Sequence, residues 1–296
     1  MAFCWIIKIK NNVAQHYRMP LQYTNINYIM GHHILALYAL YNLPSVFSFR
    51  LLFELVLATQ LTGMLGITAG AHRLWSHKSF QAAFPVRLVF MLANSAAQQG
   101  SIYHWVQDHR MHHRHTDTEL DPHSIEYGFW YSHIGWLFFK RTDKFKEAVR
   151  EITMTDMEND SIVMFQHRNY FVISQLCCFV LPTVYGYYAW DSLWIGYFLF
   201  GVVRWVALLH ITWCVNSVAH MWGSTPYNDR ISSRQNALTS IAAMGEGWHN
   251  YHHAYPYDYR ASEFNWYGEW NPTTLLIDGL EVFGLVSNKK VGILRN

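Results

Sequence analysis

Charged side chains are scarce in this chain of 296 residues. Lys, Arg, Asp and Glu together make up 14% of the sequence, against about 25% in a typical soluble domain. The net charge is only +2, and no basic run is present to support nucleic acid as a partner. Little charge combined with 17% aromatic residues is typical of a membrane protein with aromatic belts at the lipid interfaces.

Cysteine is also scarce, and the four residues of this type are Cys4, Cys177, Cys178 and Cys214. No pair of them has the spacing of a metal box, and three lie in apolar stretches. We therefore expect small apolar packing residues without a redox task. The apolar run near the N-terminus is not followed by a small-residue cleavage site, so no signal peptide is expected.

Long apolar runs, in contrast, are abundant. Crossing a bilayer takes about 20 mostly apolar residues in a helix, and four segments meet this requirement: 27–49, 51–71, 169–190 and 192–215. Short polar turns near 48–50 and at Asp191 join them into two helical hairpins. Lys and Arg gather in the remaining segments, so the positive-inside rule makes that side and both termini cytosolic.

The predicted fold class is therefore all-α: a polytopic membrane protein with four transmembrane helices and a cytosolic, histidine-rich helical cap. The cap comprises 72–168 and 216–296, and the whole chain 1–296 forms one domain. A soluble helical protein with buried hairpins is the alternative. Arg204 stands inside the fourth span, where a charge either marks a functional site or binds backbone carbonyls.

Three clusters of histidine carry the chemistry. They are His72 and His77 in HRLWSH, His109, His112 and His113 in HRMHH, and His249, His252 and His253 in HNYHH. Residues at i, i+3 and i+4 share one face of a helix, so each three-histidine box can direct its rings at one point. The first box breaks this register, because i and i+5 diverge by roughly 140° on a straight helix. It needs an unwound turn or a helix end.

One such box would be an ordinary set of histidines, but three together indicate a metal site. His220, in NSVAH, is a further candidate ligand, with Asn216 one helical turn before it. Thiolate ligands are missing, which disfavours structural zinc and iron–sulfur clusters. An imidazole shell with open positions is consistent with iron that handles O₂, and copper and zinc remain open.

Five motifs extend this pattern: GITAGAHRLWSHKSF, DHRMHH, DPHS, NSVAH and GEGWHNYHHAYPYDY. From about Asn25 to Lys290 the chain resembles the membrane-bound acyl-CoA desaturases, and is similar to the stearoyl-CoA desaturases of animals and their insect relatives. The resemblance implies a four-span, mushroom-like fold with two Fe ions. The implied ligands are His72, His77, His109, His112, His113, His220, His249, His252 and His253, with Asn216 contacting one metal through a water. Other histidines, such as His32, His115, His123 and His167, are interpreted as structural.

The implied reaction uses O₂ and two electrons to remove two hydrogens from adjacent methylenes of a fatty acyl-CoA, leaving a cis double bond. By default the bond is at the delta-9 position. The resemblance also implies substrate contacts in three regions: Gln99, Trp105 and Thr212 at the bend of an acyl tunnel, Gln60 and Met64 near its far end, and Asn25, Asp108, Lys140 and Arg141 at the coenzyme A head group. Gln107 and Gly100 depart from the family pattern, which leaves an altered acyl carrier or weaker binding open.

The third box begins with His249, where desaturases fused to cytochrome b5 typically have Gln, and no heme-binding HPGG motif occurs. The resemblance therefore implies that electrons come from a separate cytochrome b5 and its NADH-dependent reductase, at the endoplasmic reticulum membrane. The basic stretch Lys140, Arg141, Lys144, Lys146 and Arg150 is either a dock for that acidic partner or a solvated helix face.

Three rival interpretations remain. A membrane fatty acyl hydroxylase would use the same histidines to insert oxygen. A histidine-rich metal transporter would place ionisable groups along its spans, where this chain has only Glu54, Arg204 and His210. A catalytically inactive homologue is disfavoured, because all nine ligand positions are histidine.

Overall fold

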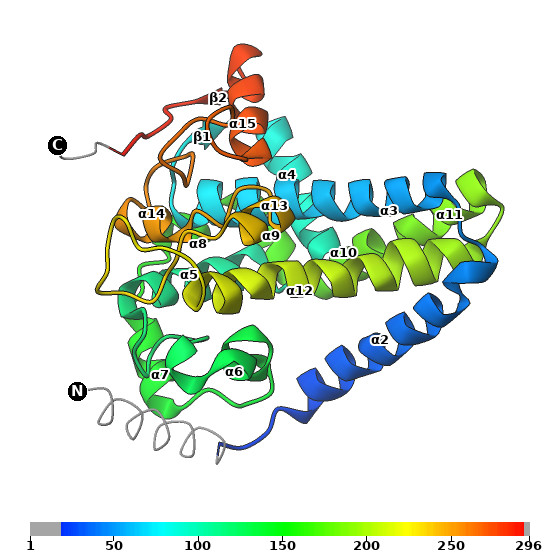
Figure 1. Ribbon diagram of the computed structural model, residues 1–296, viewed down its shortest axis with the longest axis horizontal. Coiled ribbons are helices and arrows are strands. Elements are labelled where there is room, and N and C mark those ends of the chain that lie inside the picture. The colour runs from blue at the N-terminus through cyan, green and yellow to red at the C-terminus, as the bar shows by residue number, and fades with distance from the viewer. Residues whose placement is uncertain (1–18, 293–296) are drawn as a thin grey trace.

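The computed structural model describes residues 19–292. Within this range the chain is mostly helical, and its longest helical stretches lie roughly along one direction (Figure 1). In chain order these are α2 (Tyr23–Asn42), α3 (Phe49–Thr62) with the π-helix η2 (Gly63–Ser76), α10 (Tyr170–Gln175) with η5 (Leu176–Val180) and α11 (Leu181–Trp190), and η6 (Ile195–Val203) with α12 (Arg204–Ser217) and η7 (Val218–His220).

Shorter elements make up the rest of the described chain. They are η1 (Leu43–Ser45), β1 (Gln81–Ala82), α4 (Phe84–Ala97), α5 (Ile102–His115), η3 (Ile125–Tyr127), α6 (Phe129–His133), η4 (Gly135–Leu137), α7 (Asp143–Arg150), α8 (Thr155–Glu158), α9 (Ser161–Arg168), α13 (Ala237–Ala242), α14 (His249–Ala254), α15 (Pro272–Val282) and β2 (Val286–Ser287). The two strands pair antiparallel, with Gln81 opposite Ser287. Most of these elements gather at one end of the long helices, as Figure 1 shows.

Within residues 19–292, three helical stretches are long and apolar enough to cross a membrane: Phe49–Ser76, Tyr170–Trp190 and Ile195–His220. They correspond to the predicted spans 51–71, 169–190 and 192–215. The predicted segment 27–49 is a helix only as far as Asn42, because Leu43 and Pro44 begin a 3₁₀ turn and proline has no N–H to continue the ladder. This helix, α2, is 20 residues long but is not apolar enough to be counted with the other three.

The first histidine box lies at the end of η2, where a π-helical turn replaces the α-helical one. The N–H of His77 donates to the carbonyl oxygen of His72 over 3.2 Å. This i→i+5 bond brings residues five apart onto one side of the helix. The sequence required an unwound turn or a helix end here, and the structure confirms the helix end: His77 is the residue that ends η2.

Arg204 is 3% exposed and donates to the carbonyl oxygens of Phe200, Ala96 and Cys178 at 2.7, 3.0 and 3.3 Å. Of the two roles considered for it, the structure shows the binding of backbone carbonyls. Its guanidinium thereby ties the start of α12 to η6, to the C-terminal end of α4 and to the π-helical turn η5.

Two glycines allow α11 and η6 to approach closely. A Cβ atom on Gly186 would lie 2.3 Å from the Cα atom of Gly196, well inside van der Waals contact. A side chain here would push two spans apart. Gly31 in α2 faces no heavy atom within 4 Å of its own added Cβ, so it offers a matched control.

We expect Gly186→Ala to lower the apparent melting temperature of the detergent-purified protein by at least about 3 °C, since overpacking typically costs about 1–3 kcal/mol. Gly31→Ala should leave the melting temperature within about 1 °C or raise it slightly. Fluorescence-detected size exclusion after heating measures both. Equal melting temperatures for the two variants would show that the helices do not meet at Gly186.

Candidate metal centre

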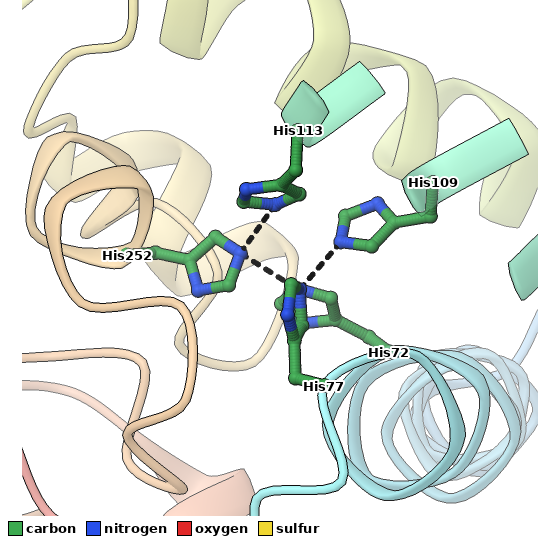
Figure 2. Close-up of side chains that lie close together, drawn as sticks. All are labelled: His72, His77, His109, His113 and His252. Atoms are coloured by element: carbon green, nitrogen blue, oxygen red, sulfur yellow. Dashed lines mark hydrogen bonds between the residues drawn. The ribbon is translucent and has the colours of Figure 1, made fainter. Parts of the chain in front are cut away.

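Nine histidine side chains from four segments lie in two adjoining groups. The first group contains His72, His77, His109, His113 and His252, and the second contains His112, His220, His249 and His253. Within each group the ring nitrogens that face one another all lie within 4.8 Å. Figure 2 shows the first group: His72 and His77 come from the end of η2, His109 and His113 from α5, and His252 from α14. The histidines predicted from the sequence as metal ligands are therefore brought together.

The rings of both groups present the same atom, Nε2, to one another. In the first group the Nε2 atoms of His77 and His109 are 2.7 Å apart, and those of His72 and His252 are 3.0 Å apart. In the second group the separations run from 2.9 to 3.2 Å. Ligand nitrogens about 2.1 Å from one ion lie roughly 3 Å apart on neighbouring vertices. The two groups thus have the spacing of two metal sites.

Acidic and hydroxyl groups hold the outer nitrogens of three of these rings. His72 Nδ1 lies 2.8 Å from Glu246 Oε2, and His112 Nδ1 lies 2.9 Å from Asp121 Oδ1. His220 Nδ1 lies 2.7 Å from the Ser232 hydroxyl. Such outer partners fix the orientation and tautomer of metal-binding histidines.

The outer partners also decide what the inner nitrogens can hold. A carboxylate only accepts hydrogen bonds, so Nδ1 of His72 and of His112 carries the proton, and Nε2 of each neutral ring is bare. These two rings lie in different groups, so each group contains a bare Nε2 lone pair that can bind a cation. The donor set therefore fits metal ions.

Burial lowers the pKa of six of these imidazoles well below the ordinary value, and the neighbouring rings lower it further. They are His77, His109, His113, His249, His252 and His253. A low pKa keeps the imidazole neutral, which is the form that binds a metal.

The carboxylate of Glu246 stays ionised although it is buried. Burial alone would raise its pKa, but Arg73 and His72 outweigh burial and lower the pKa to about 2. Arg73, 1% exposed, donates from Nε to Glu246 over 2.9 Å and from Nη1 to the Tyr259 carbonyl and the Thr274 hydroxyl, each over 3.1 Å. The guanidinium thus anchors the carboxylate that orients His72.

A cavity of about 850 Å³ opens beside the first group. His109 and Asn216 line it, as do seven of the nine predicted substrate contacts: Asn25, Gln99, Trp105, Asp108, Lys140, Arg141 and Thr212. The two remaining predicted contacts, Gln60 and Met64, are not among its lining residues. Gln107 is not among them either, whereas Gly100 is.

Two of the three residues predicted near the tunnel bend are joined by a hydrogen bond, and the third stacks on His109, a predicted metal ligand. Gln99 donates from Nε2 to the Thr212 hydroxyl over 2.9 Å, and the Trp105 ring stacks on His109 with centroids 4.9 Å apart. The predicted head-group contacts also line the cavity. There Arg141 donates to Asp108 over 2.9 Å, and Asn25 Nδ2 donates to the Leu137 carbonyl over 3.1 Å.

Four residues of this site were not predicted from the sequence: Glu246, Asp121, Ser232 and Arg73. Asp121 stands in DPHS and Glu246 in GEGWHN, so a carboxylate beside a histidine box was the available signal. Ser232 is in no box, and only the fold brings it to His220. His123, interpreted as structural, is buried against His112 with ring centroids 4.3 Å apart.

The described cysteines and the basic stretch predicted from the sequence take no part in the two histidine groups. Cys177, Cys178 and Cys214 are free thiols away from both histidine groups, and Cys4 lies outside the described residues. In the basic stretch, Arg141, Lys144 and Lys146 each pair with a carboxylate, namely Asp108, Glu119 and Asp143.

Similarity to known proteins agrees with this arrangement of membrane helices and paired histidine groups. Residues 48–267 match the family model for fatty acid desaturases. Stearoyl-CoA desaturase 5 of Bos taurus is 43% identical over 278 residues, which cover 94% of this chain and 82% of that protein. Delta(9)-fatty-acid desaturase fat-6 of Caenorhabditis elegans is 41% identical over 278 residues, covering 93% of this chain and 80% of that protein. Acyl-CoA Delta-9 desaturase of Acheta domesticus is 41% identical over 263 residues, covering 88% and 73%. The chain belongs to the fatty acid desaturase family.

We expect Asp121→Asn to weaken metal binding about 10–100-fold, the usual effect of losing the outer partner of a ligating histidine. Metal content after dialysis against graded chelator, measured by mass spectrometry, tests this. Asp143→Asn is the control, because Asp143 is exposed and pairs only with Lys146. Chelator curves that coincide for Asp121→Asn and the unmodified protein would show that Asp121 does not support His112.

A second carboxylate predicts how stability depends on pH. Asp156 accepts from Arg110 and pairs with Lys78, and so joins the segments that carry the first two boxes. Burial would raise its pKa, but these two cations outweigh burial and hold the pKa below the ordinary 3.8. A folded pKa below the unfolded one gives stability that is complete above the unfolded pKa and is lost as the pH falls.

The unmodified protein should therefore melt higher than Asp156→Asn at pH 6, and the difference should shrink at pH 3. Glu151→Gln removes an exposed pair with Arg114 and should show little difference at either pH. The measurement is the melting temperature of the unmodified protein and of both variants, in detergent, at the two pH values. A difference that stays constant would mean that Asp156 is not held ionised by its partners.

Proposed function

We propose that this protein is an oxygen-dependent acyl-CoA desaturase that introduces a cis double bond into a saturated fatty acyl chain. The observation that carries the proposal is the meeting of nine Nε2 atoms, in two groups, beside a cavity of about 850 Å³. The named relatives act as stearoyl-CoA and Delta-9 desaturases, which favours the delta-9 position.

The proposed cofactor is a pair of iron ions, with O₂ as co-substrate. One ion would be held by His72, His77, His109, His113 and His252, and the other by His112, His220, His249 and His253, with Asn216 contacting it through a water. Iron with open positions supplies the oxidising chemistry that an unactivated C–H bond requires. One saturated chain, one O₂, two electrons and two protons give one cis-unsaturated chain and two waters.

The protein's own residues bind and position the chain. The Gln99–Thr212 hydrogen bond and the Trp105 ring border the cavity beside His109, so they can hold two methylenes of a bent chain next to the ligands. Holding a flexible chain in one geometry is the main contribution of the protein to such a reaction. Gln60 and Met64 stay proposals for the far end of the chain.

The head group of the acyl-CoA is proposed to bind where the cavity becomes polar. Lys140 and Arg141 carry the charge that phosphates pair with, and Asn25 and Asp108 line the same cavity. Gly100 has a φ of +94° and donates its N–H to the Tyr170 hydroxyl. A conformation that few other residues adopt explains why a glycine stands at this departure from the family pattern.

The membrane arrangement is proposed to include α2 as a fourth span. Its 20 residues extend about 30 Å, the thickness of the hydrocarbon core, and Ile34, Leu37 and Tyr41 are exposed on it. The histidine-rich cap and both termini would face the cytosol at the endoplasmic reticulum, and all of 1–296 would form one desaturase domain. Electrons would come from cytochrome b5 and its NADH-dependent reductase, docking near the basic residues of α7.

Expression in a yeast strain that lacks its own desaturase tests the function. We expect growth without added unsaturated fatty acid, and lipids with a new cis double bond when analysed by gas chromatography. Hydroxylated chains instead of alkenes would identify a hydroxylase, and zinc or copper uptake without a new lipid would favour a transporter. Either result would overturn the proposal.

In the same strain, His112→Ala and His252→Ala should abolish the product, a loss of at least about 100-fold, with protein levels unchanged. His167→Ala is the control, because His167 lies outside both groups and bonds to Ser101. Lipid analysis together with immunoblotting of membranes measures the effect. Full activity in either of the first two variants would refute the ligand assignment.

A further inference from the structure

Three histidines outside the metal centre form a hydrogen-bonded string across α2, α12 and α6. His33 Nε2 lies 3.1 Å from His210 Nε2, and His210 Nδ1 lies 2.9 Å from His133 Nε2. The ends of the string are the Ile29 carbonyl, 2.8 Å from His33 Nδ1, and the Ser217 hydroxyl, 2.9 Å from His133 Nδ1. The predicted roles of metal ligand and substrate contact involve none of these five residues.

The proton order along this string follows from its ends. The Ile29 carbonyl only accepts, so Nδ1 of His33 carries a proton and its Nε2 is bare in the neutral ring. His210 then donates from Nε2, and its bare Nδ1 accepts from His133 Nε2. His133 Nδ1 can accept in turn from the Ser217 hydroxyl, whose single hydrogen has the Trp213 carbonyl oxygen, 2.8 Å away, as its other acceptor. When Ser217 donates to His133, one neutral arrangement supplies a hydrogen to each contact of the string without placing a charge inside the protein.

Two faces of α12 meet different partners. Leu209, Thr212 and Asn216 lie at i, i+3 and i+7 and line the cavity, whereas His210 and Ser217 lie one residue further along and hold the string. A helix cannot turn one face without turning the other. The string therefore fixes the angle at which the cavity face meets a chain in the cavity.

Trp213 links the two faces directly. It lines the cavity and is 3% exposed, and the rings of the string surround it. Its centroid lies 5.2 Å from that of His210, 5.7 Å from that of His133 and 6.4 Å from that of His33, with the His33 ring nearly parallel. The three imidazoles thus limit the positions that this indole can take.

We propose that the His33–His210–His133–Ser217 string is a positioning device that sets the site of desaturation. It holds Thr212 and Trp213 at a fixed rotation of α12, and thereby fixes which methylenes of the chain lie beside the ligands. This inference rests on the proposed desaturase function. The string touches no metal ligand through its rings, so its loss should change where the double bond forms more than whether it forms.

His210→Phe tests the proposal, since it keeps a ring of similar size and removes both hydrogen bonds. His32→Phe is the matched control, because His32 is the neighbouring residue on α2, bonds to the Tyr28 carbonyl and not to the string, and packs on Phe179 and Trp205 through ring contacts that a phenyl ring keeps. The variants are expressed in desaturase-deficient yeast, and the position of each double bond is mapped by mass spectrometry. We expect His210→Phe to change the ratio of minor to major bond positions about tenfold, the effect of one lost buried hydrogen bond, while His32→Phe matches the unmodified protein.

An unchanged ratio in His210→Phe, with product merely reduced, would overturn the proposal, because a structural role lowers yield without moving the bond. If that variant makes no product, Ser217→Ala decides, since it removes only the end of the string: a shifted ratio supports the proposal and an unchanged one overturns it. If the unmodified protein makes no double bond, the desaturase function fails instead. In that case the string is tested by binding: the melting temperature is measured with saturated acyl-CoAs of several chain lengths. We then expect the chain length that raises the melting temperature most to differ between His210→Phe and the unmodified protein.

Discussion

Nine imidazole Nε2 atoms meet in two groups, with neighbouring atoms 2.7 to 3.2 Å apart, and this spacing fits one cation in each group. The rest of the structure is organised to hold it. η2, α5, η7 and α14 each supply part of the set, although up to 180 residues separate partners in the sequence. Buried polar groups, above all Glu246 and Asp121, fix the rings from outside. The helices that cross the membrane provide the rigid base on which these four segments meet.

Much of this could be predicted from the sequence, because the deciding signals are local. The spacing of histidines in each box, the apolar runs and the turn at Asp191 all report structure within a few residues. The boundary of α2 was predicted less well, since the apolar pattern continues beyond Pro44 while the helix does not. The π-helical register of His72 and His77 could be stated only as a need for a helix end.

The outer partners could not be predicted, and the reason is physical. Ser232 reaches His220, and Arg73 reaches Glu246 and Thr274, through contacts between segments distant in sequence. No periodicity reports such contacts. The same holds for the string through His33, His133 and His210, which the sequence shows as three unrelated histidines. Burying an unpaired polar group inside a membrane protein costs free energy. The partner of each such group can be identified only from the complete fold, because a short stretch of sequence does not contain both members of the pair.

The metal centre and the histidine string have different proposed roles in such an enzyme. The metal centre is the proposed site of oxidation, and the string fixes the face of α12 that lines the cavity. The more basic claim is that the two histidine groups bind two ions. Anomalous diffraction at the iron edge, from crystals of protein expressed with iron, tests it most directly. The account predicts two peaks, one among His72, His77, His109, His113 and His252 and one among His112, His220, His249 and His253. A single peak, or density outside these groups, would contradict it.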